Sequence, residues 1–299
     1  MKRSNLPCEF SLIGCGRAGC SLAYALRVAG LRVAALMDRN RKAAARAFRF
    51  LGAGKILSSV EEVPRFSDLV FVAVPDSEIR LVAEEIAKKN VSLEGKCFFH
   101  LSGALGPGVL TALEKRGASV GSMHPLQTFP RPSKDRSLFE GIFFGIAGRR
   151  PACATAKTLI RTIGAEAVLI QGKEKSLYHA ASVIACNYPV LLIDEALAIL
   201  EHIGISRQKA RKALGPLVKR AIDNCFERGP SRALSGPVVR VDCETVEAHL
   251  RALRAYNPEL RREYCSFGLK AVRLALSGGL ISRSDSDRLR GILQSREDS

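Results

Sequence analysis

Three groups of polar residues in this chain have the types and spacing needed to handle a carbonyl group and a proton. They occupy residues 75–76, 100–103 and 124–128, and each follows a short apolar run with the composition of a β-strand. Ligands of an open parallel sheet bind beyond the carboxyl ends of its strands. Because three successive strands end in such groups, we expect the groups to meet at one edge of a sheet and to line one site.

The residue types suggest how this site is divided. Pro75 and Asp76, with Val74 before them, are expected to line a cofactor channel, and Ser102 could hydrogen-bond a cofactor carboxamide. A carbonyl or carboxylate substrate would face the other residues of the two later groups, which are His100, Gly103, His124, Gln127 and Thr128. For His100 a second interpretation stays open, in which backbone groups at the strand end satisfy the imidazole.

A proton donor is expected on the long helical segment that begins near residue 175. His179 and Asn187 are eight residues apart, which places them on one side of a helix. His179 is the first candidate for protonating a developing alkoxide and His124 the second, because a histidine can carry a proton near neutral pH. Asn187 would orient the substrate. The alternative for Tyr178 and His179 is a purely structural role in packing between domains.

The elements that position these groups begin with residues 10–38. An apolar strand ends at a glycine-rich turn, a helical pattern follows and stops at Gly30, and a second strand ends at Asp38. The turn consists of Gly14, Cys15, Gly16, Arg17, Ala18 and Gly19. In this GxGxxG pattern the glycines allow the sharp turn, the approach of a pyrophosphate and close helix–strand packing. The free amides of a helix N-terminus favour an anion, so the sequence predicts a dinucleotide site.

The sequence contains residues that favour NAD and others that favour NADP. Asp38, nineteen residues after Gly19, suits the free ribose hydroxyls of NAD and would repel a 2′-phosphate. Arg39, Arg41 and Lys42 would bind that phosphate. We expect NADP, provided that Asp38 turns aside, with NAD as the alternative.

The order of elements predicts an α/β protein with two domains. Up to residue 171 strand patterns alternate with helical ones, which indicates a doubly wound parallel sheet, so residues 1–171 are expected to form a Rossmann NAD(P)-binding domain. Residues 172–299 contain only helical patterns and are expected to form an all-helical substrate and dimerisation domain. We expect neither a signal peptide after the basic start nor an apolar run that approaches membrane-spanning length.

Composition narrows the location and the partners. Nine cysteines are scattered without a CxxC pair, which favours a reducing cytoplasm and predicts no metal site. The net charge of +17 would attract anionic cofactors and carboxylate substrates. Nucleic acid is a less favoured partner, because tryptophan is absent and aromatic residues are few.

Several motifs give the chain a resemblance to a known superfamily. They are VAVPD at 72–76, HLSG at 100–103, HPLQTF at 124–129, YHAA at 178–181 with Asn187, and ALSGP at 233–237, followed by Asp242, Thr245 and His249. The layout resembles the dehydrogenases that include phosphogluconate dehydrogenase, ketopantoate reductase, pyrroline-5-carboxylate reductase and prephenate dehydrogenase. Closer still, nearly the whole chain is similar to Rossmann-like proteins whose helical domain was long catalogued as of unknown function.

The resemblance implies an NADP-dependent oxidoreductase that reduces a small 2-keto acid, with ketopantoate as the best single substrate, and a homodimer formed through the helical domain. Relatives carry a lysine four residues before the asparagine, but Val183 stands there, which leaves the proton donor open. Ser235 lies on a loop that could close over the substrate, and Arg240 could pair with a substrate carboxylate or face solvent. The alternatives are an imine or prephenate-type dehydrogenase and a non-catalytic dinucleotide sensor.

Overall fold

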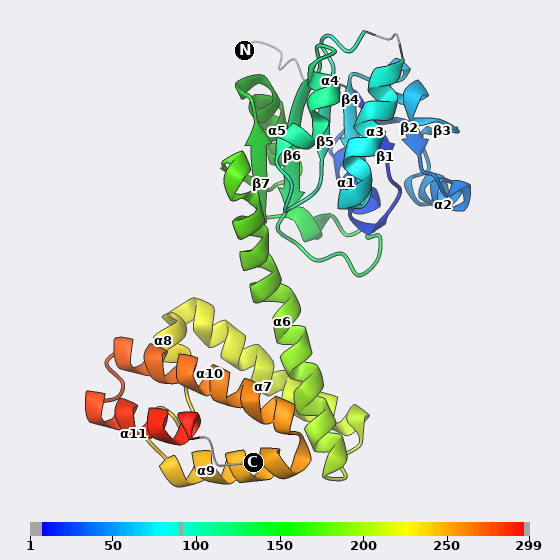
Figure 1. Ribbon diagram of the computed structural model, residues 1–299. Coiled ribbons are helices and arrows are strands. Elements are labelled where there is room, and N and C mark those ends of the chain that lie inside the picture. Colours follow the sequence, from blue (N-terminus) through cyan, green and yellow to red (C-terminus); the bar gives the residue numbers. More distant parts are fainter. Residues whose placement is uncertain (1–7, 90–91, 296–299) are drawn as a thin grey trace. The chain divides into compact units, whose positions relative to one another are not determined.

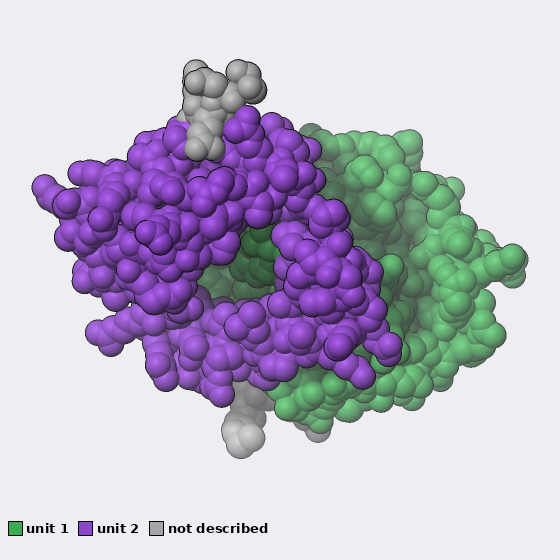
Figure 2. All heavy atoms as spheres, turned by 90° about the horizontal axis from the view of Figure 1, so that it is seen from below, with its two compact units in different colours: residues 1–192 green, residues 193–299 purple. Residues whose placement is uncertain are grey.

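The structure, a computed structural model, describes residues 8–89 and 92–295. Contacts within the chain divide it into two compact units, Met1–Leu192 and Ile193–Ser299, coloured green and purple in Figure 2. The sequence placed the domain boundary at 171/172, where the strand patterns end. The boundary by contacts falls later, inside the long helix α6 (Lys175–His202), because the first turns of α6 pack against the unit that holds the sheet.

The first unit is built on an eight-stranded sheet with the order β3-β2-β1-β4-β5-β6-β7-β8 (Figure 1). Its strands are β1 (Glu9–Ile13), β2 (Arg32–Met37), β3 (Lys55–Leu57), β4 (Leu69–Val72), β5 (Cys97–His100), β6 (Ser119–Pro125), β7 (Phe143–Gly148) and β8 (Glu166–Leu169). The strand order reverses between β1 and β4, which creates the crevice where doubly wound folds bind ligands.

The sheet differs from the predicted parallel one at a single strand pair, since β6 and β7 run antiparallel while the others are parallel. The segment between them holds only a short 3₁₀ turn, η3 (Arg136–Phe139). A parallel return needs a crossover connection, usually a helix, so the chain comes back antiparallel here. The sheet is therefore mixed, and the α/β class stands as predicted.

Helices cover both faces of the sheet (Figure 1). One face carries α1 (Arg17–Val28), α2 (Arg41–Leu51) and α5 (Arg150–Thr162), and the other carries α3 (Asp76–Lys88), α4 (Thr111–Glu114) and the 3₁₀ turns η1 (Val60–Arg65) and η2 (Pro107–Leu110). Strand β4 shows why an unbroken apolar run was needed: Phe71 packs between Phe10 and Phe99 on one face, while Val70 and Val72 face the other core.

The second unit is helical, as the sequence predicted. It contains the end of α6 and the helices α7 (Arg207–Arg228), α8 (Pro230–Ala233), α9 (Cys243–Tyr256), α10 (Pro258–Ser277) and α11 (Arg283–Gln294). Asp242, Asn257 and Ser282 cap the last three long helices through side-chain oxygens that accept backbone N–H groups. A small core that includes Val246 and Val272 joins them.

Helix α6 differs from the expectation that no segment reaches membrane-spanning length. It continues through Pro189, and among the described residues one stretch, Gly172–His202, is long and apolar enough to cross a membrane by length and composition alone. Only 6% of its most apolar 18-residue segment is buried by other parts of the chain. Leu177, Ile184 and Leu191 are among its exposed apolar side chains, so much of this surface lacks a cover.

Candidate functional site

The glycine turn between β1 and α1 has the geometry expected of a dinucleotide site. Gly14 has a φ of +90°, and a Cβ there would lie 2.5 Å from the carbonyl oxygen of Ala73. A Cβ on Gly19 would meet the Gly14 carbonyl at 2.7 Å, which confirms the close helix–strand packing. Gly16 has no heavy atom within 4 Å of its Cβ position, and no side chain caps α1 at this residue. Open space in front of uncapped amides fits a phosphate group.

Asp38 follows β2 as predicted and is anchored to this turn. One carboxylate oxygen accepts the backbone N–H of Cys15 at 2.7 Å, and the other accepts that of Asn40 at 2.8 Å. Asp38 therefore orders the turn in addition to any contact with a ribose. Arg39 is exposed and forms an ion pair with Glu78 of α3 at 2.6 Å.

A cavity of about 540 Å³ lies at the switch point of the sheet, in front of the glycine turn. Its walls include the predicted residues Gly14, Gly16, Asp38, Arg39, Val74 and Pro75, together with Ser58, Ser59 and Glu78, which sequence reasoning had not assigned to the site. Arg17 and Ala18 form the first turn of α1 beside it, and Cys15 lies buried under the turn. Six of the predicted cofactor residues thus line one cavity, whereas Asp76 and Ser102 do not.

Ser102 orders the loop after β5. Its hydroxyl donates to Asp76 Oδ2 at 2.7 Å and accepts the backbone N–H groups of Ala104 and Leu105. A hydroxyl has one proton and two acceptor sites, so this set fills its capacity. A direct bond from Ser102 to a cofactor carboxamide, as expected from the sequence, would require one of these bonds to break.

His100 is held by the backbone and is not available to a substrate. Its Nδ1 accepts the N–H of Ser102 at 3.3 Å, and its Nε2 lies 3.2 Å from the carbonyl oxygen of Gly106. Burial is the main cause that lowers the pKa of His100 to about 4. The expectation that His100 binds substrate is therefore wrong, and the strand-end interpretation holds, because both ring nitrogens are occupied.

His124, His179 and Gly103 converge on one point. A Cβ on Gly103 would lie 2.8 Å from His124 Nε2 and closer still to His179 Nδ1. The two imidazole rings are perpendicular, with centroids 5.5 Å apart. His179 Nδ1 is buried and has no hydrogen-bond partner. The two ring nitrogens therefore pack directly against Gly103, which leaves no room for a side chain at residue 103.

Two residues of this cluster were not assigned from the sequence. Tyr178 lies against Gly145, and its hydroxyl is 3.1 Å from His124 Nδ1. Lys175 is fully buried, its Nζ has no hydrogen-bond partner, and it lies 5.4 Å from the centroid of the Tyr178 ring. A lysine one helical turn before a tyrosine–histidine pair was a visible signal, since residues three and four apart share a helix face.

The charge states of the cluster differ from those expected. Burial, together with the charge of Lys175, lowers the pKa of His124 to about 4. His124 is therefore neutral near neutral pH, which contradicts the premise that it serves as an imidazolium. Burial also lowers the pKa of Lys175 to about 8, so its amine is still mostly protonated at pH 7.

A second cavity, of about 610 Å³, opens beside this cluster. Its walls include His124, Gln127, Thr128, Tyr178, His179, Val183 and Asn187. His179 and Asn187 thus share one face of α6, as their spacing predicted. The Gln127 side chain binds its own loop, through Leu138 O and the N–H of Thr128, so it shapes the wall of the cavity. Ser235 and Arg240 are exposed residues of the second unit, and their contact with substrate stays a prediction.

These features define a Rossmann-type dinucleotide fold with a polar cluster at the carboxyl ends of β5 and β6. Residues 4–125 match the family described as Rossmann-like domain, and residues 142–271 match the family described as domain of unknown function DUF2520. The chain therefore joins a Rossmann-like domain to a DUF2520 domain. A search of curated proteins gave no match.

Solved structures with the same fold cover almost the whole chain. A protein described as a candidate NADP oxidoreductase from Bacteroides fragilis is similar with a TM-score of 0.73 and 23% identity, over 90% of this chain and 98% of that one. A reductive aminase from Aspergillus terreus, in complex with NADPH and ethyl-5-oxohexanoate, has a TM-score of 0.60 and 14% identity, over 96% and 92%. The prephenate dehydrogenase of Aquifex aeolicus has a TM-score of 0.53 and 17% identity, over 90% and 98%.

Proposed function

We propose that this protein is an NADP-dependent oxidoreductase that reduces a C=O or C=N bond of a small carboxylate. The observation that carries the proposal is the cavity of about 610 Å³ lined by His124, His179 and Asn187, which lies in the same unit as the glycine turn and beside which His179 Nδ1 has no hydrogen-bond partner. The similar structures support it, because they include a candidate NADP oxidoreductase and an NADPH-bound reductive aminase.

Different residues of the chain would have different roles in such a reduction. A cofactor whose pyrophosphate binds at the glycine turn would supply the hydride from its nicotinamide to the substrate carbon. His179, whose Nδ1 has no partner in the structure, is our candidate for donating a proton to the developing oxyanion or amine. His124 contributes a hydrogen bond to the same atom, and Asn187 orients the substrate in the adjoining cavity.

A 2-keto acid, with ketopantoate as the first choice, fits the combination of a polar cluster and a basic protein. Cyclic imines and prephenate are the second candidates, supported by the folds of the reductive aminase and the prephenate dehydrogenase. A dinucleotide sensor is the alternative from another class of protein, and it predicts cofactor binding without turnover.

The experiment is to follow the oxidation of NADPH and NADH by absorbance with ketopantoate, other 2-keto acids and cyclic imines, and the reduction of NADP⁺ with prephenate. We expect turnover with NADPH and at least one carbonyl or imine. Stabilisation of the protein by either cofactor without turnover on any substrate would reject the enzyme and favour the sensor.

Replacing Arg39 by alanine tests the preference for NADP. Its ion pair with Glu78 is a surface pair of low net energy, so a 2′-phosphate can replace the carboxylate. We expect Arg39→Ala to raise the KM for NADPH about tenfold and to leave that for NADH unchanged, because charge-assisted bonds to phosphate are worth roughly 1.5–3 kcal/mol. Arg32→Ala, which removes a similar exposed pair with Glu9, is the control. Equal effects on both cofactors would contradict the assignment.

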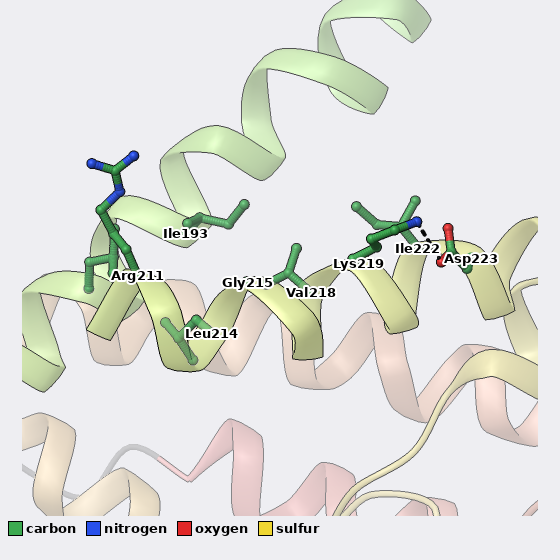
Figure 3. Close-up of a pocket in the computed structure, with 9 residues that line it drawn as sticks. Ile193, Arg211, Leu214, Gly215, Val218, Lys219, Ile222 and Asp223 are labelled. Atoms are coloured by element: carbon green, nitrogen blue, oxygen red, sulfur yellow. Dashed lines mark hydrogen bonds and ion pairs between the residues drawn. The ribbon is translucent and has the colours of Figure 1, made fainter. Parts of the chain in front are cut away.

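We further propose that a second copy of the chain covers the apolar helices of the second unit. A groove of about 400 Å³ runs between the end of α6 and α7, lined by Ile193, Leu214, Val218 and Ile222 (Figure 3). Phe226 on the same helix α7 is 86% exposed. Exposed apolar area of this kind is typical of an interface between subunits.

Phe226→Asp tests this interface. We expect the wild-type protein to be a dimer in sedimentation at micromolar concentration and the variant to dissociate at least about tenfold more readily, because it buries a charge in place of a ring. Phe48→Asp, which changes an exposed phenylalanine of α2, should leave the dimer unchanged. A monomeric wild-type protein, or one that requires detergent because α6 enters a membrane, would contradict the proposal.

A further inference from the structure

We propose that Tyr178 is a positioning residue: it fixes the imidazole of His124, in the wall of the cavity of about 610 Å³, as the Nε2–H tautomer. A carbonyl oxygen or imine nitrogen of a substrate in that cavity would accept a hydrogen bond from this N–H. The inference rests on the proposed oxidoreductase function and assigns a role to a residue for which the sequence offered only a role in packing.

The first step concerns the proton of the Tyr178 hydroxyl. A hydrogen bond from the backbone of Gly145 lowers the pKa of Tyr178 in opposition to burial, which raises it. A bond with that effect stabilises the phenolate, so it comes from the backbone N–H and occupies the phenol oxygen as an acceptor. The hydroxyl proton is therefore free to be donated to His124 Nδ1, 3.1 Å away.

The second step follows from the chemistry of a neutral imidazole. One ring nitrogen carries the proton and the other accepts, so a His124 that accepts at Nδ1 must donate at Nε2. Nε2 is the nitrogen that lies against Gly103, at 2.8 Å from the position of a Cβ. The tautomer set by Tyr178 thus places an N–H donor at the ring nitrogen beside Gly103.

The third step is the reason why the imidazole is neutral. The charged and titratable groups that face His124 are Lys175, His179 and His100, and all of them oppose a positive charge on the ring, in addition to burial. Lys175 contributes as an ammonium group that has no hydrogen-bond partner of its own. His124 therefore acts as a hydrogen-bond donor that does not titrate near neutral pH, and the transferred proton comes from another group.

The test reads the tautomer directly. In protein labelled with ¹⁵N-histidine, long-range ¹H–¹⁵N correlation distinguishes the protonated from the unprotonated ring nitrogen, and the spectrum of His124→Gln identifies the signals of His124. In the wild-type protein we expect a single Nε2–H form of His124 that is unchanged between about pH 5.5 and 8. In Tyr178→Phe we expect the Nδ1–H form to appear, and kcat to fall about tenfold with KM for the carbonyl substrate nearly unchanged.

The chain offers a matched control in its second unit. Tyr264 forms the same kind of contact, with its hydroxyl 2.9 Å from Nδ1 of His249. Tyr264→Phe should change the signals of His249 and leave those of His124 and the turnover as they are. An Nδ1–H form of His124 in the wild-type protein, or an unchanged tautomer and kcat in Tyr178→Phe, would overturn the proposal.

The readouts also separate this inference from the proposed function. The tautomer and pH range of His124 are measured without substrate or cofactor, and the wild-type measurement needs only His124→Gln, as the variant that assigns the signals. A fixed Nε2–H form in a protein that reduces no substrate would reject the oxidoreductase and retain Tyr178 as the residue that positions His124.

Discussion

Gly103→Ala is expected to lose at least about 100-fold in turnover while it still binds the cofactor. The new Cβ would lie 2.8 Å from His124 Nε2 and 3.0 Å from its Cδ2, and closer to His179 Nδ1. Both rings must therefore move from the positions that they hold in the wall of the cavity of about 610 Å³, where the substrate is expected. A displacement of about 1 Å in a catalytic group can lower the rate by about 10². Overpacking at this buried position should also cost about 1–3 kcal/mol of stability.

Gly108→Ala is the matched control for this variant. Gly108 lies in η2, five residues further along the same segment, and has no heavy atom within 4 Å of its Cβ position. Turnover and the melting temperature should stay at the wild-type values there. If Gly103→Ala kept wild-type turnover, the reaction would not depend on the positions of the two histidines beside Gly103.

The sequence predicted the cofactor half of the site well because a local signal specifies it. The glycines of the turn and Asp38 lie within one strand–helix–strand unit, and their roles follow from backbone geometry. The helix starts at Asp242 and Asn257 depend on equally local contacts, since a cap and its N–H partners are two or three residues apart.

The substrate half was predicted less well because its contacts join distant residues. Whether His100 faces a ligand depends on a loop carbonyl at Gly106, and the charge of His124 depends on Lys175, fifty-one residues away. The antiparallel strand β7 is a related case, since its direction is set by pairing with β6. Periodicity assigns a strand but does not determine its direction.

Helix α6 shows a different limit of sequence reasoning. Its apolar residues are distributed around the helix, and the sequence predicted only a long helical segment beginning near residue 175. In the structure, most of that apolar surface is not covered by other parts of the chain. A helix that is apolar on all sides is normally buried. Its composition does not show whether a second subunit or a membrane covers it.

Lys175→Met is expected to stabilise the protein and to reduce its activity. Lys175 is buried, and no hydrogen bond to its Nζ offsets the cost of burying the charge. Burial lowers its pKa from 10.5 to about 8. One pKa unit corresponds to 1.36 kcal/mol, so the protonated lysine destabilises the folded state by about 3 kcal/mol. Methionine fills a similar volume without a charge, and a raised melting temperature at pH 7 should show the gain.

The stability gained by Lys175→Met should depend on pH, and the direction of this dependence tests whether the buried charge is the cause. Between about pH 8 and 10.5 the unfolded chain keeps the Lys175 proton and the folded protein has lost it, so wild-type stability rises with pH in this range. The advantage of Lys175→Met in denaturant unfolding should therefore be full below about pH 8 and shrink towards pH 10.5. Lys173→Met, at an exposed position before α6, should show no such dependence.

The activity of Lys175→Met separates a functional from a structural lysine. Without the ammonium group the pKa of His124 should rise towards its usual value, because Lys175 is the largest of the charges that lower it. We therefore expect kcat to fall most below about pH 6, where an imidazolium begins to replace the neutral ring. Greater stability together with a weaker, more acid-sensitive activity would show that the buried charge is kept for function. A variant that is less stable, or as active as the wild type at every pH, would contradict this role.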